Sequence, residues 1–155
     1  MQEASWYENV TIPALLRHAR TTYGEAIRTA LEEAGYDDIP GNGLYIIGGL
    51  ALDDRDIPLR QLVKELGITK QGAGQLVDAL VMRGYLSRTP LESDRRQLTI
   101  ALTERGRAAA EVQRQARERI DAELTTKIGT EDLRATRRAL GTLIDMRREQ
   151  ADAAA

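Results

Sequence analysis

The stretch of sequence that decides the fold is LVKELGITKQGAGQL, residues 62–76. Apolar residues at helical spacing lie on both sides of Gly67, and glycine can adopt the left-handed backbone of a tight turn between two helices. Thr69 follows that turn, where its hydroxyl can cap the first turn of the next helix. The pattern predicts a helix-turn-helix whose second helix begins at Thr69 and ends at Gly84.

The second helix of this unit carries polar residues and glycines on the side away from its apolar stripe. These residues are Lys70, Gln71, Gly74, Gln75 and Asp78. A glutamine amide can pair with adenine, lysine can reach guanine or a phosphate, and glycine lets the backbone approach the floor of a DNA groove. An ordinary helical corner with a polar outer face has the same pattern, so DNA binding and plain packing both remain open here.

A β-hairpin with a charged tip is predicted after this helix. Residues 85–89 have strand-like composition, residues 90–96 are polar and turn-forming, and residues 97–102 alternate apolar with polar or small side chains. Such a hairpin supplies a wing beside the helix-turn-helix, which makes DNA binding the favoured interpretation.

The tip of the hairpin carries two arginines, Arg95 and Arg96. Guanidinium groups on a narrow projection suit a minor groove, where the negative potential is enhanced. We expect Asp94 to hold Arg96 through a charge-assisted pair, which would orient a long and flexible side chain. A solvated charged turn is the alternative, because surface ion pairs contribute little.

Amphipathic helices are predicted on both sides of the winged unit. The first runs from Thr11 to a stop at Gly35, and residues 44–52 form an apolar helix that should be buried and should cross its neighbours closely at Gly48 and Gly49. A long helical pattern follows residue 103, breaks at Gly129 and is expected to fray after Arg148. Residues 53–58 are expected to lead into the short helix that ends at Gly67.

These terminal helices carry apolar stripes that the winged unit has little surface to cover. The simplest solution is a second copy of the chain, so that terminal helices from two chains bury each other's stripes in a two-fold homodimer.

Composition restricts the classes of function. The 155 residues are enough for one domain, 42% are hydrophobic and 30% charged, and the chain contains no cysteine and one histidine. Thiol chemistry and cysteine metal sites are therefore excluded, and we predict no enzyme, no metal site and no cofactor. Net charge is −2, yet residues 55–107 carry ten basic and six acidic side chains, as expected if this part faces an anion.

The apolar runs are too short for a membrane protein. The longest, residues 43–52, is about half of the roughly 20 residues that cross a bilayer. No basic leader with an apolar core opens the chain, so a cytoplasmic location is expected and no membrane partner is predicted.

The segment DRRQLTIALTERG, residues 94–106, resembles the wing signature of the MarR family of bacterial transcription regulators. In that signature Asp, a gap and Arg precede a Leu-Thr pair and a final Thr-x-x-Gly. The segments LVDAL (76–80) and RGYL (83–86) are similar to the family's recognition helix and its exit into the wing. The resemblance covers residues 12–148.

The resemblance implies a mainly α fold with a small β-hairpin, in which a winged helix-turn-helix is flanked by N- and C-terminal dimerisation helices. Residues 1–155 would form a single domain, with the winged lobe at about 55–103 and the dimerisation helices at about 11–35 and 104–150. A homodimer would bind a pseudo-palindromic operator in double-stranded DNA. The implied DNA-binding residues are Thr69, Lys70, Gln71, Gly74 and Gln75 for the major groove, and Arg96 for the wing. Arg95 is a further DNA-binding candidate because it lies at the same tip.

Members of the family often lose DNA affinity when a small, frequently aromatic ligand enters a crevice beside the dimerisation helices. Candidates to line such a crevice are Trp6, Arg17, His18 and Tyr45, for which plain packing is the alternative. The branch of the family that senses peroxide through cysteine is excluded. The remaining alternative function is a winged-helix module that binds protein, and the salt dependence of DNA binding distinguishes the two.

Overall fold

The computed structural model describes residues 5–53, 57–58, 64, 67–90, 92–96 and 98–154. The chain divides into two compact units, Met1–Arg117 and Glu118–Ala155, which are described separately below. The prediction of a single domain stays a prediction. No helix in the described ranges combines the length and the apolar character that crossing a bilayer requires.

The first unit begins with a short 3-10 helix, η1 (Trp6–Asn9), and continues into α1 (Ile12–Glu33). Thr11 precedes α1, and Gly35 follows it with a φ of +83°, as the sequence predicts. Burial is confined to the second half of the helix, where Ile27 and Leu31 enter the core, whereas Ile12 is 63% exposed. The predicted apolar stripe is therefore covered along half of its length within one chain.

Helix α2 (Gly43–Asp53) is almost entirely apolar but buried along one side only, so the expectation that the whole helix is buried is wrong. Ile46, Ile47 and Leu50 are buried, but Leu52 is 86% exposed. Gly48 makes the predicted close approach, because a Cβ atom there would lie 3.2 Å from the side-chain oxygen of Gln113 in α5 (Glu104–Ala153). Gly49 faces open space and makes no such approach. A run of apolar residues does not reveal by itself which face of a helix the neighbouring elements cover.

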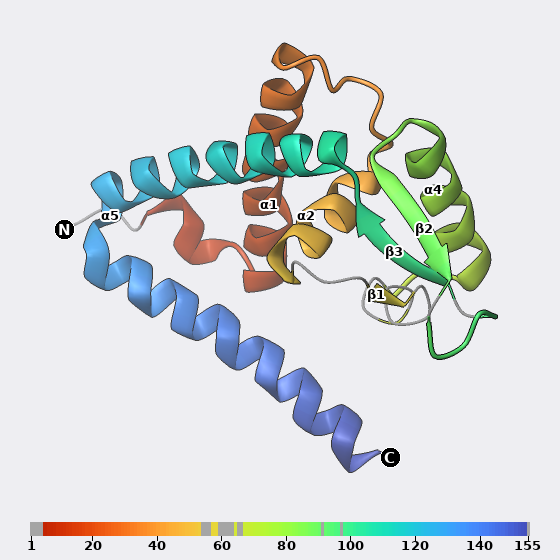
Figure 1. Cartoon of the computed structure of the whole chain (residues 1–155). Helices are drawn as coiled ribbons and strands as arrows, with labels where there is room; N and C mark the ends of the chain where they lie inside the picture. The colour runs from red at the N-terminus through yellow and green to blue at the C-terminus, as the bar shows by residue number, and fades with distance from the viewer. Residues whose placement is uncertain are drawn as a thin grey trace. The chain divides into compact units, whose positions relative to one another are not determined.

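The wing and the helix before it are confirmed. Helix α4 (Lys70–Met82) leads into β2 (Leu86–Pro90), which pairs antiparallel with β3 (Leu98–Leu102). Figure 1 shows α4 lying beside this hairpin, and the two are in contact through β2.

The sheet has a third strand that the sequence did not predict. β1 (Ile57–Pro58) pairs with the other edge of β3, which gives the order β1–β3–β2. From the sequence, Ile57 and Pro58 are expected only to lead into a helix. Their pairing with β3 is missed because two residues are too few to show the alternation of a strand. The predicted first helix of the helix-turn-helix lies, except for Lys64, outside the described residues.

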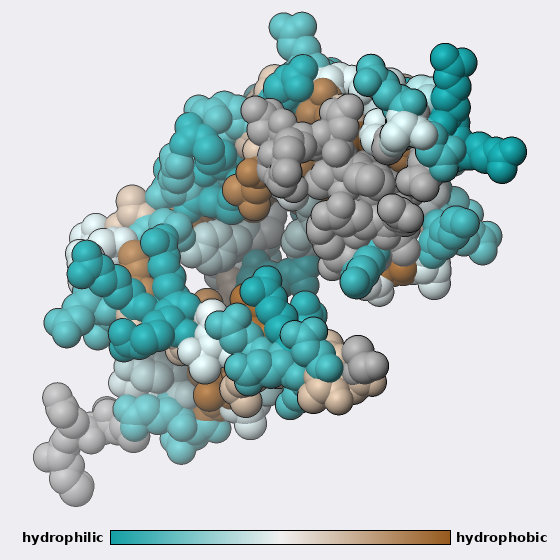
Figure 2. Space-filling view, turned by 60° about the horizontal axis from the view of Figure 1, so that its bottom comes forward, coloured by the Kyte–Doolittle hydropathy of each residue, from teal (hydrophilic) through white to brown (hydrophobic). Residues whose placement is uncertain are grey.

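The core of the first unit lies where α1, α2 and α4 meet the sheet and the start of α5. Its largest fully buried side chains include Leu31, Ile47, Leu80, Tyr85 and Ile100. In the face drawn in Figure 2, hydrophilic side chains predominate and hydrophobic ones form separate small patches. Helix α4 and the wing therefore pack against a common apolar centre.

Helix α5 (Glu104–Ala153) begins in the first unit and supplies most of the second. Gly129 interrupts it with a φ of +83°, as predicted, and an ion pair between Asp121 and Arg137 (3.4 Å) spans the interruption. The helix continues to Ala153, so the expectation that the chain frays after Arg148 is wrong. Apolar side chains of the second unit remain exposed at Leu140, Leu143, Ile144 and Met146.

Candidate nucleic-acid interface

Helix α4 has one buried face and one polar face. Ala73, Val77 and Leu80 are buried against the core, and the predicted contact residues Lys70, Gln71 and Gln75 are exposed on the other side. Gly74 lies partly exposed among them. The helix therefore presents three long hydrogen-bonding side chains to solvent from a rigid base.

Thr69 fixes the start of this helix. Its hydroxyl oxygen accepts a hydrogen bond from the backbone N–H of Gly72 at 3.0 Å, which satisfies one of the free donors of the first turn. Thr69 is exposed at the N-terminal end of α4, where the DNA contacts are predicted. Its hydroxyl oxygen is already engaged in the helix cap.

Gly74 leaves the middle of the polar face without a side chain, and a Cβ atom there would meet nothing within 4 Å. Gly74→Ala should therefore raise the free energy of unfolding by about 0.5 to 1 kcal/mol, because alanine favours the helix. If the backbone approaches a groove at this point, the same variant should bind DNA more weakly. Urea unfolding and DNA titration on one preparation test both statements, and unchanged DNA affinity would contradict a close backbone approach.

The wing tip exposes both predicted arginines, Arg95 and Arg96. Asp94 Oδ1 accepts a hydrogen bond from the backbone N–H of Arg96 at 3.0 Å. This contact shapes the backbone of the turn, and it is a different contact from the expected pairing of the two side chains. Asp94 therefore acts on Arg96 by holding the main chain from which its side chain projects.

An ion pair that the sequence did not predict ties the wing to α4. Arg88 in β2 donates from Nη2 to Asp78 Oδ1, on the outer side of α4. Asp78, whose negative charge would repel a DNA phosphate, is thus paired with a guanidinium group. No local signal could identify this partner, because the two residues lie on different elements.

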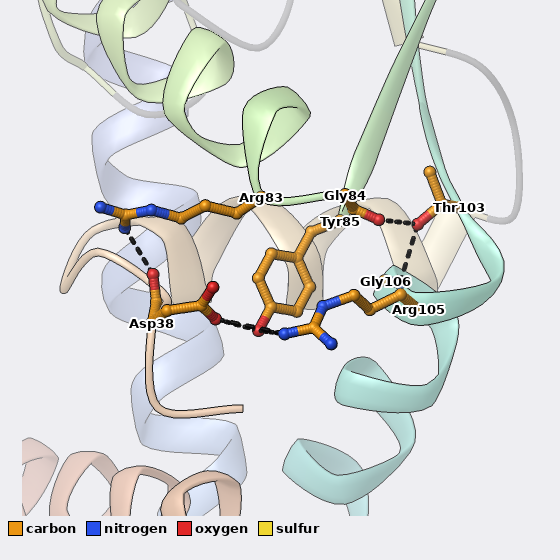
Figure 3. Close-up of polar contacts among 7 residues, drawn as sticks. All are labelled: Asp38, Arg83, Gly84, Tyr85, Thr103, Arg105 and Gly106. Atoms are coloured by element: carbon orange, nitrogen blue, oxygen red, sulfur yellow. Dashed lines mark hydrogen bonds and ion pairs between the residues drawn. The ribbon is translucent and has the colours of Figure 1, made fainter. Parts of the chain in front are cut away.

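The junction between α4 and the wing is held by a polar cluster, which Figure 3 shows. The hydroxyl of the buried Tyr85 donates to Asp38 Oδ1 in the loop between α1 and α2, and it accepts from Arg105 Nη2 at 3.0 Å. Arg83 donates to the backbone oxygen of Asp38. We call Asp38, Tyr85 and Arg105 the junction cluster.

These contacts shift the acidity of the cluster. The hydrogen bond from Tyr85 and the charge of Arg105 hold the pKa of Asp38 below its usual value, and the pKa of Arg105 is raised, chiefly by its hydrogen bond with Tyr85. Burial and then the hydrogen bond to Asp38 raise the pKa of Tyr85 to about 12.

The alkaline titration of Tyr85 follows from that shift. Because its pKa is higher in the folded chain than the ordinary value near 10, its stabilising contribution is complete below about pH 10 and is lost as pH rises through 12. Ultraviolet absorbance of phenolate should show one ionisation near pH 12 that Tyr85→Phe removes. Identical titration curves for the two proteins would contradict the burial and bonding of this hydroxyl.

The Thr-x-x-Gly segment, Thr103 to Gly106, also holds this junction through hydrogen bonds at the start of α5. The hydroxyl of Thr103 donates to the backbone oxygen of Gly84 and accepts from the backbone N–H of Gly106 at 3.1 Å. A Cβ atom at Gly106 would lie 2.1 Å from the backbone oxygen of Tyr85. Only glycine lets the first turn of α5 approach the wing so closely.

Sequence comparison identifies this part of the chain. Residues 38–97, which include Asp38, α4, β2 and the wing tip, match the sequence model of the MarR family. This segment is similar to the MarR family. That family consists of DNA-binding transcriptional regulators, and the match agrees with the resemblance drawn from the wing. A search of curated proteins finds no match.

Solved structures share the fold over most of the chain. FabT from Streptococcus pneumoniae in complex with DNA superposes with a TM-score of 0.76 at 20% identity, over 89% of this chain and 96% of that one. MepR from S. aureus in its DNA-binding conformation gives a TM-score of 0.71 at 18% identity, over 88% and 98%. A cysteine-to-serine mutant of MarR from E. coli complexed with operator DNA gives 0.69 at 19% identity, over 91% and 99%. The predicted fold class is therefore confirmed.

Two hollows in the first unit lie away from α4 and the wing. The larger, of about 710 Å³, runs along α1 and is lined by Arg17, Arg20, Arg28 and Tyr45 among others. The smaller, of about 430 Å³, lies between α1, α2 and the start of α5. In the described part of the chain neither hollow is lined by Trp6 or His18, so two of the four ligand candidates lie elsewhere.

The smaller hollow includes residues that the sequence did not single out. Gln113 in α5 is 1% exposed, and its side-chain oxygen accepts from Arg117 at 3.5 Å. Its side-chain nitrogen has no hydrogen-bond partner among the described residues. Arg20 stacks 4.5 Å over the ring of Tyr45 at the edge shared by both hollows. An apolar hollow with a few polar groups is typical of small-molecule sites.

Proposed function

We propose that this chain regulates transcription by binding duplex DNA as a homodimer, with α4 in the major groove and the wing tip at the minor groove. The observation that carries the proposal is the pairing of two exposed features on one rigid base. Lys70, Gln71 and Gln75 project from a helix whose opposite face is buried, and Arg95 and Arg96 project from the hairpin that follows it.

Each side chain has a specific role in this proposal. Gln71 and Gln75 present amides that can pair with base edges, and Lys70 can reach guanine or a phosphate. Arg96 enters the minor groove, where a narrow groove strengthens the attraction of a guanidinium group, and Arg95 adds charge beside it. Since Gly74 offers no side chain, part of the specificity comes from the shape of the DNA.

Homodimer formation is supported by apolar side chains that one chain leaves uncovered. In the second unit, Leu140, Leu143 and Ile144 recur at helical spacing and are exposed, and in the first unit Ile12 and Leu16 are exposed along α1. The occupant that fits these stripes is a second copy of the same helices. Light scattering should give twice the chain mass of 17.2 kDa at micromolar concentration, and a monomer would contradict the proposal.

Selection of bound fragments from a random duplex library tests the DNA-binding proposal directly. The expected product is a pseudo-palindrome whose half-sites lie about one helical turn, roughly 10 base pairs, apart. Binding that selects no duplex at low salt would overturn the proposal, and a single unpaired site would overturn the dimer. The protein-binding alternative predicts neither selection nor salt dependence.

Lys70→Ala is expected to reduce the slope of log affinity against log salt by about 1 per half-site if Lys70 contacts phosphate, because one fewer counterion is released. Titration of the selected duplex at several salt concentrations measures this slope. An unchanged slope with altered sequence preference would assign Lys70 to a base instead.

We further propose that the protein represses its target and is released when a small aromatic ligand enters the smaller hollow. Arg20, Arg117 and the amide nitrogen of Gln113 provide donors for an acidic or polar group, and Tyr23, Tyr45 and Leu44 provide apolar and aromatic walls. Benzoate serves as the probe. It should raise the thermal midpoint of the free protein and weaken binding to the selected duplex, and both effects should be lost in Gln113→Leu. Weakened DNA binding that persists in Gln113→Leu would place the ligand elsewhere.

A further inference from the structure

We infer that the junction cluster, Asp38, Tyr85 and Arg105, positions the wing relative to α4 and thereby sets DNA affinity without contacting DNA. This role rests on the proposed DNA binding. Tyr85 is completely buried, so it can affect a bound duplex only through the residues around it.

The cluster acts at the place where a small rotation has a large effect. Helix α4 ends at Met82 and β2 begins at Leu86, so three residues connect the two DNA-reading elements. Gly84, the middle one, has a φ of +80°, which glycine adopts readily. A change in the dihedral angles of this connection would swing the wing tip relative to the polar face of α4.

Each residue of the connection is held by a partner that is distant in sequence. Arg83 donates to the backbone oxygen of Asp38, the backbone oxygen of Gly84 accepts from Thr103, and the hydroxyl of Tyr85 contacts both Asp38 and Arg105. These partners belong to the loop after α1 and to the residues at the start of α5. The connection is thus fixed to two elements outside the wing and α4 (Figure 3).

Arg105 fixes the plane of the cluster. Its guanidinium carbon lies 4.7 Å from the ring centre of Tyr85 and 5.4 Å from that of Tyr36, and the two rings meet edge to face at 6.2 Å. One nitrogen of the same group donates to the Tyr85 hydroxyl and lies 3.4 Å from Asp38. A planar guanidinium group with several donors restricts the orientation of the Tyr85 ring more than a lysine ammonium would.

Because the ion pair between Asp38 and Arg105 is partly exposed, its effect on the position of the wing can be measured apart from its effect on folding stability. The side chains of Asp38 and Arg105 are each 43% exposed, and exposed ion pairs contribute little to folding. Removing one of them should therefore leave the chain folded while it frees the connection. If the pair only stabilised the fold, removing Asp38 or Arg105 would leave DNA affinity unchanged at temperatures where the chain is fully folded.

Two variants test this role by removing single polar groups, Tyr85→Phe and Asp38→Asn. Glu111→Gln is the matched control, because it breaks an exposed pair with Arg114 on α5 and changes net charge by the same one unit as Asp38→Asn. Binding to the duplex selected by the wild-type protein is measured well below the thermal midpoint. We expect each cluster variant to bind about three- to tenfold more weakly and the control to bind as the wild type does.

A double-mutant cycle with Arg96→Ala measures the coupling between the cluster and the wing arginine, which a purely structural role would leave at zero. If the cluster positions the wing, Arg96→Ala should lose less affinity in the Tyr85→Phe background than in the wild type, because the wing is already misplaced. Additive effects, or affinity unchanged in both cluster variants, would overturn the inference. Arg105→Lys should restore little of the affinity that Arg105→Ala loses.

Hydrogen exchange on the free protein distinguishes failure of this role from failure of DNA binding. Both cluster variants should exchange faster in residues 34–42 and in the wing, at 86–90 and 98–102, while the start of α1 is unchanged. Protection unchanged in the wing would overturn the inference even if the wild type binds DNA. Selection of no duplex by the wild type would overturn the proposed function, and this exchange pattern would still decide whether the cluster holds the wing.

Discussion

Gly106→Ala is expected to lower the free energy of unfolding by about 3 kcal/mol, because among the glycines of this chain it is the one where an added Cβ atom would lie closer than 3.0 Å to an atom of another described residue. The new Cβ atom would lie 2.1 Å from the backbone oxygen of Tyr85 and 3.0 Å from a methyl group of Leu102. Neither the backbone of the junction nor the first turn of α5 can move away without breaking the hydrogen bonds of Thr103. The contact must be relieved by separating α5 from the wing.

Urea unfolding at one fixed protein concentration measures this loss, since a dimer would make the midpoint depend on concentration. Gly74→Ala is the control, because it adds the same atom to a helix where nothing lies within 4 Å. The two variants should shift the midpoint in opposite directions. A Gly106→Ala protein as stable as the wild type would show that α5 does not approach the wing as described.

Arg96→Ala is expected to reduce affinity for the selected duplex by about 1 to 3 kcal/mol and to relax the preference for an A·T-rich flank. The physical reason is that a minor groove concentrates negative potential, so one guanidinium group placed there contributes more than one on an open surface. Asp94 strengthens the effect by holding the backbone of the turn through the N–H of Arg96.

Arg134→Ala removes the same charge from an exposed site in the second unit and serves as the control for Arg96→Ala. Competition titrations with duplexes that differ only in the flank separate affinity from preference. If Arg96→Ala weakens binding no more than the control does, the wing lies off the DNA. If affinity falls equally on all flanks, Arg96 contacts phosphate and reads no groove shape.

Much of the interface could be predicted because its signals are local. The exposed row on α4 follows from the 3.6-residue period, since residues that alternate with a buried stripe must face the other way. Thr69 was predicted as a cap from its place before the stripe, and the structure confirms that bond. The interruption at Gly129 was also predicted locally, because the helical apolar pattern breaks there and a helix-start pattern follows at Thr130.

The supporting contacts could not be predicted, because each joins residues that no period relates. Asp38 looked like one acidic residue in a polar loop, yet its carboxylate accepts from Tyr85, 47 positions later. Arg88 and Asp78 are ordinary surface charges until a strand and a helix bring them together. Ile57 and Pro58 became a strand only because β3 offered them an unpaired edge.

The amino-acid sequence by itself determined the order of the helices, the winged hairpin, the polar row on α4 and the two arginines at the tip, because the physical cause of each lies within a few residues along the chain. The tertiary structure alone decided which side of α2 is covered, which carboxylate holds Tyr85 and why Gly106 must lack a side chain. Those features depend on how closely separate elements approach, and that distance is set by packing of the whole core rather than by any local preference.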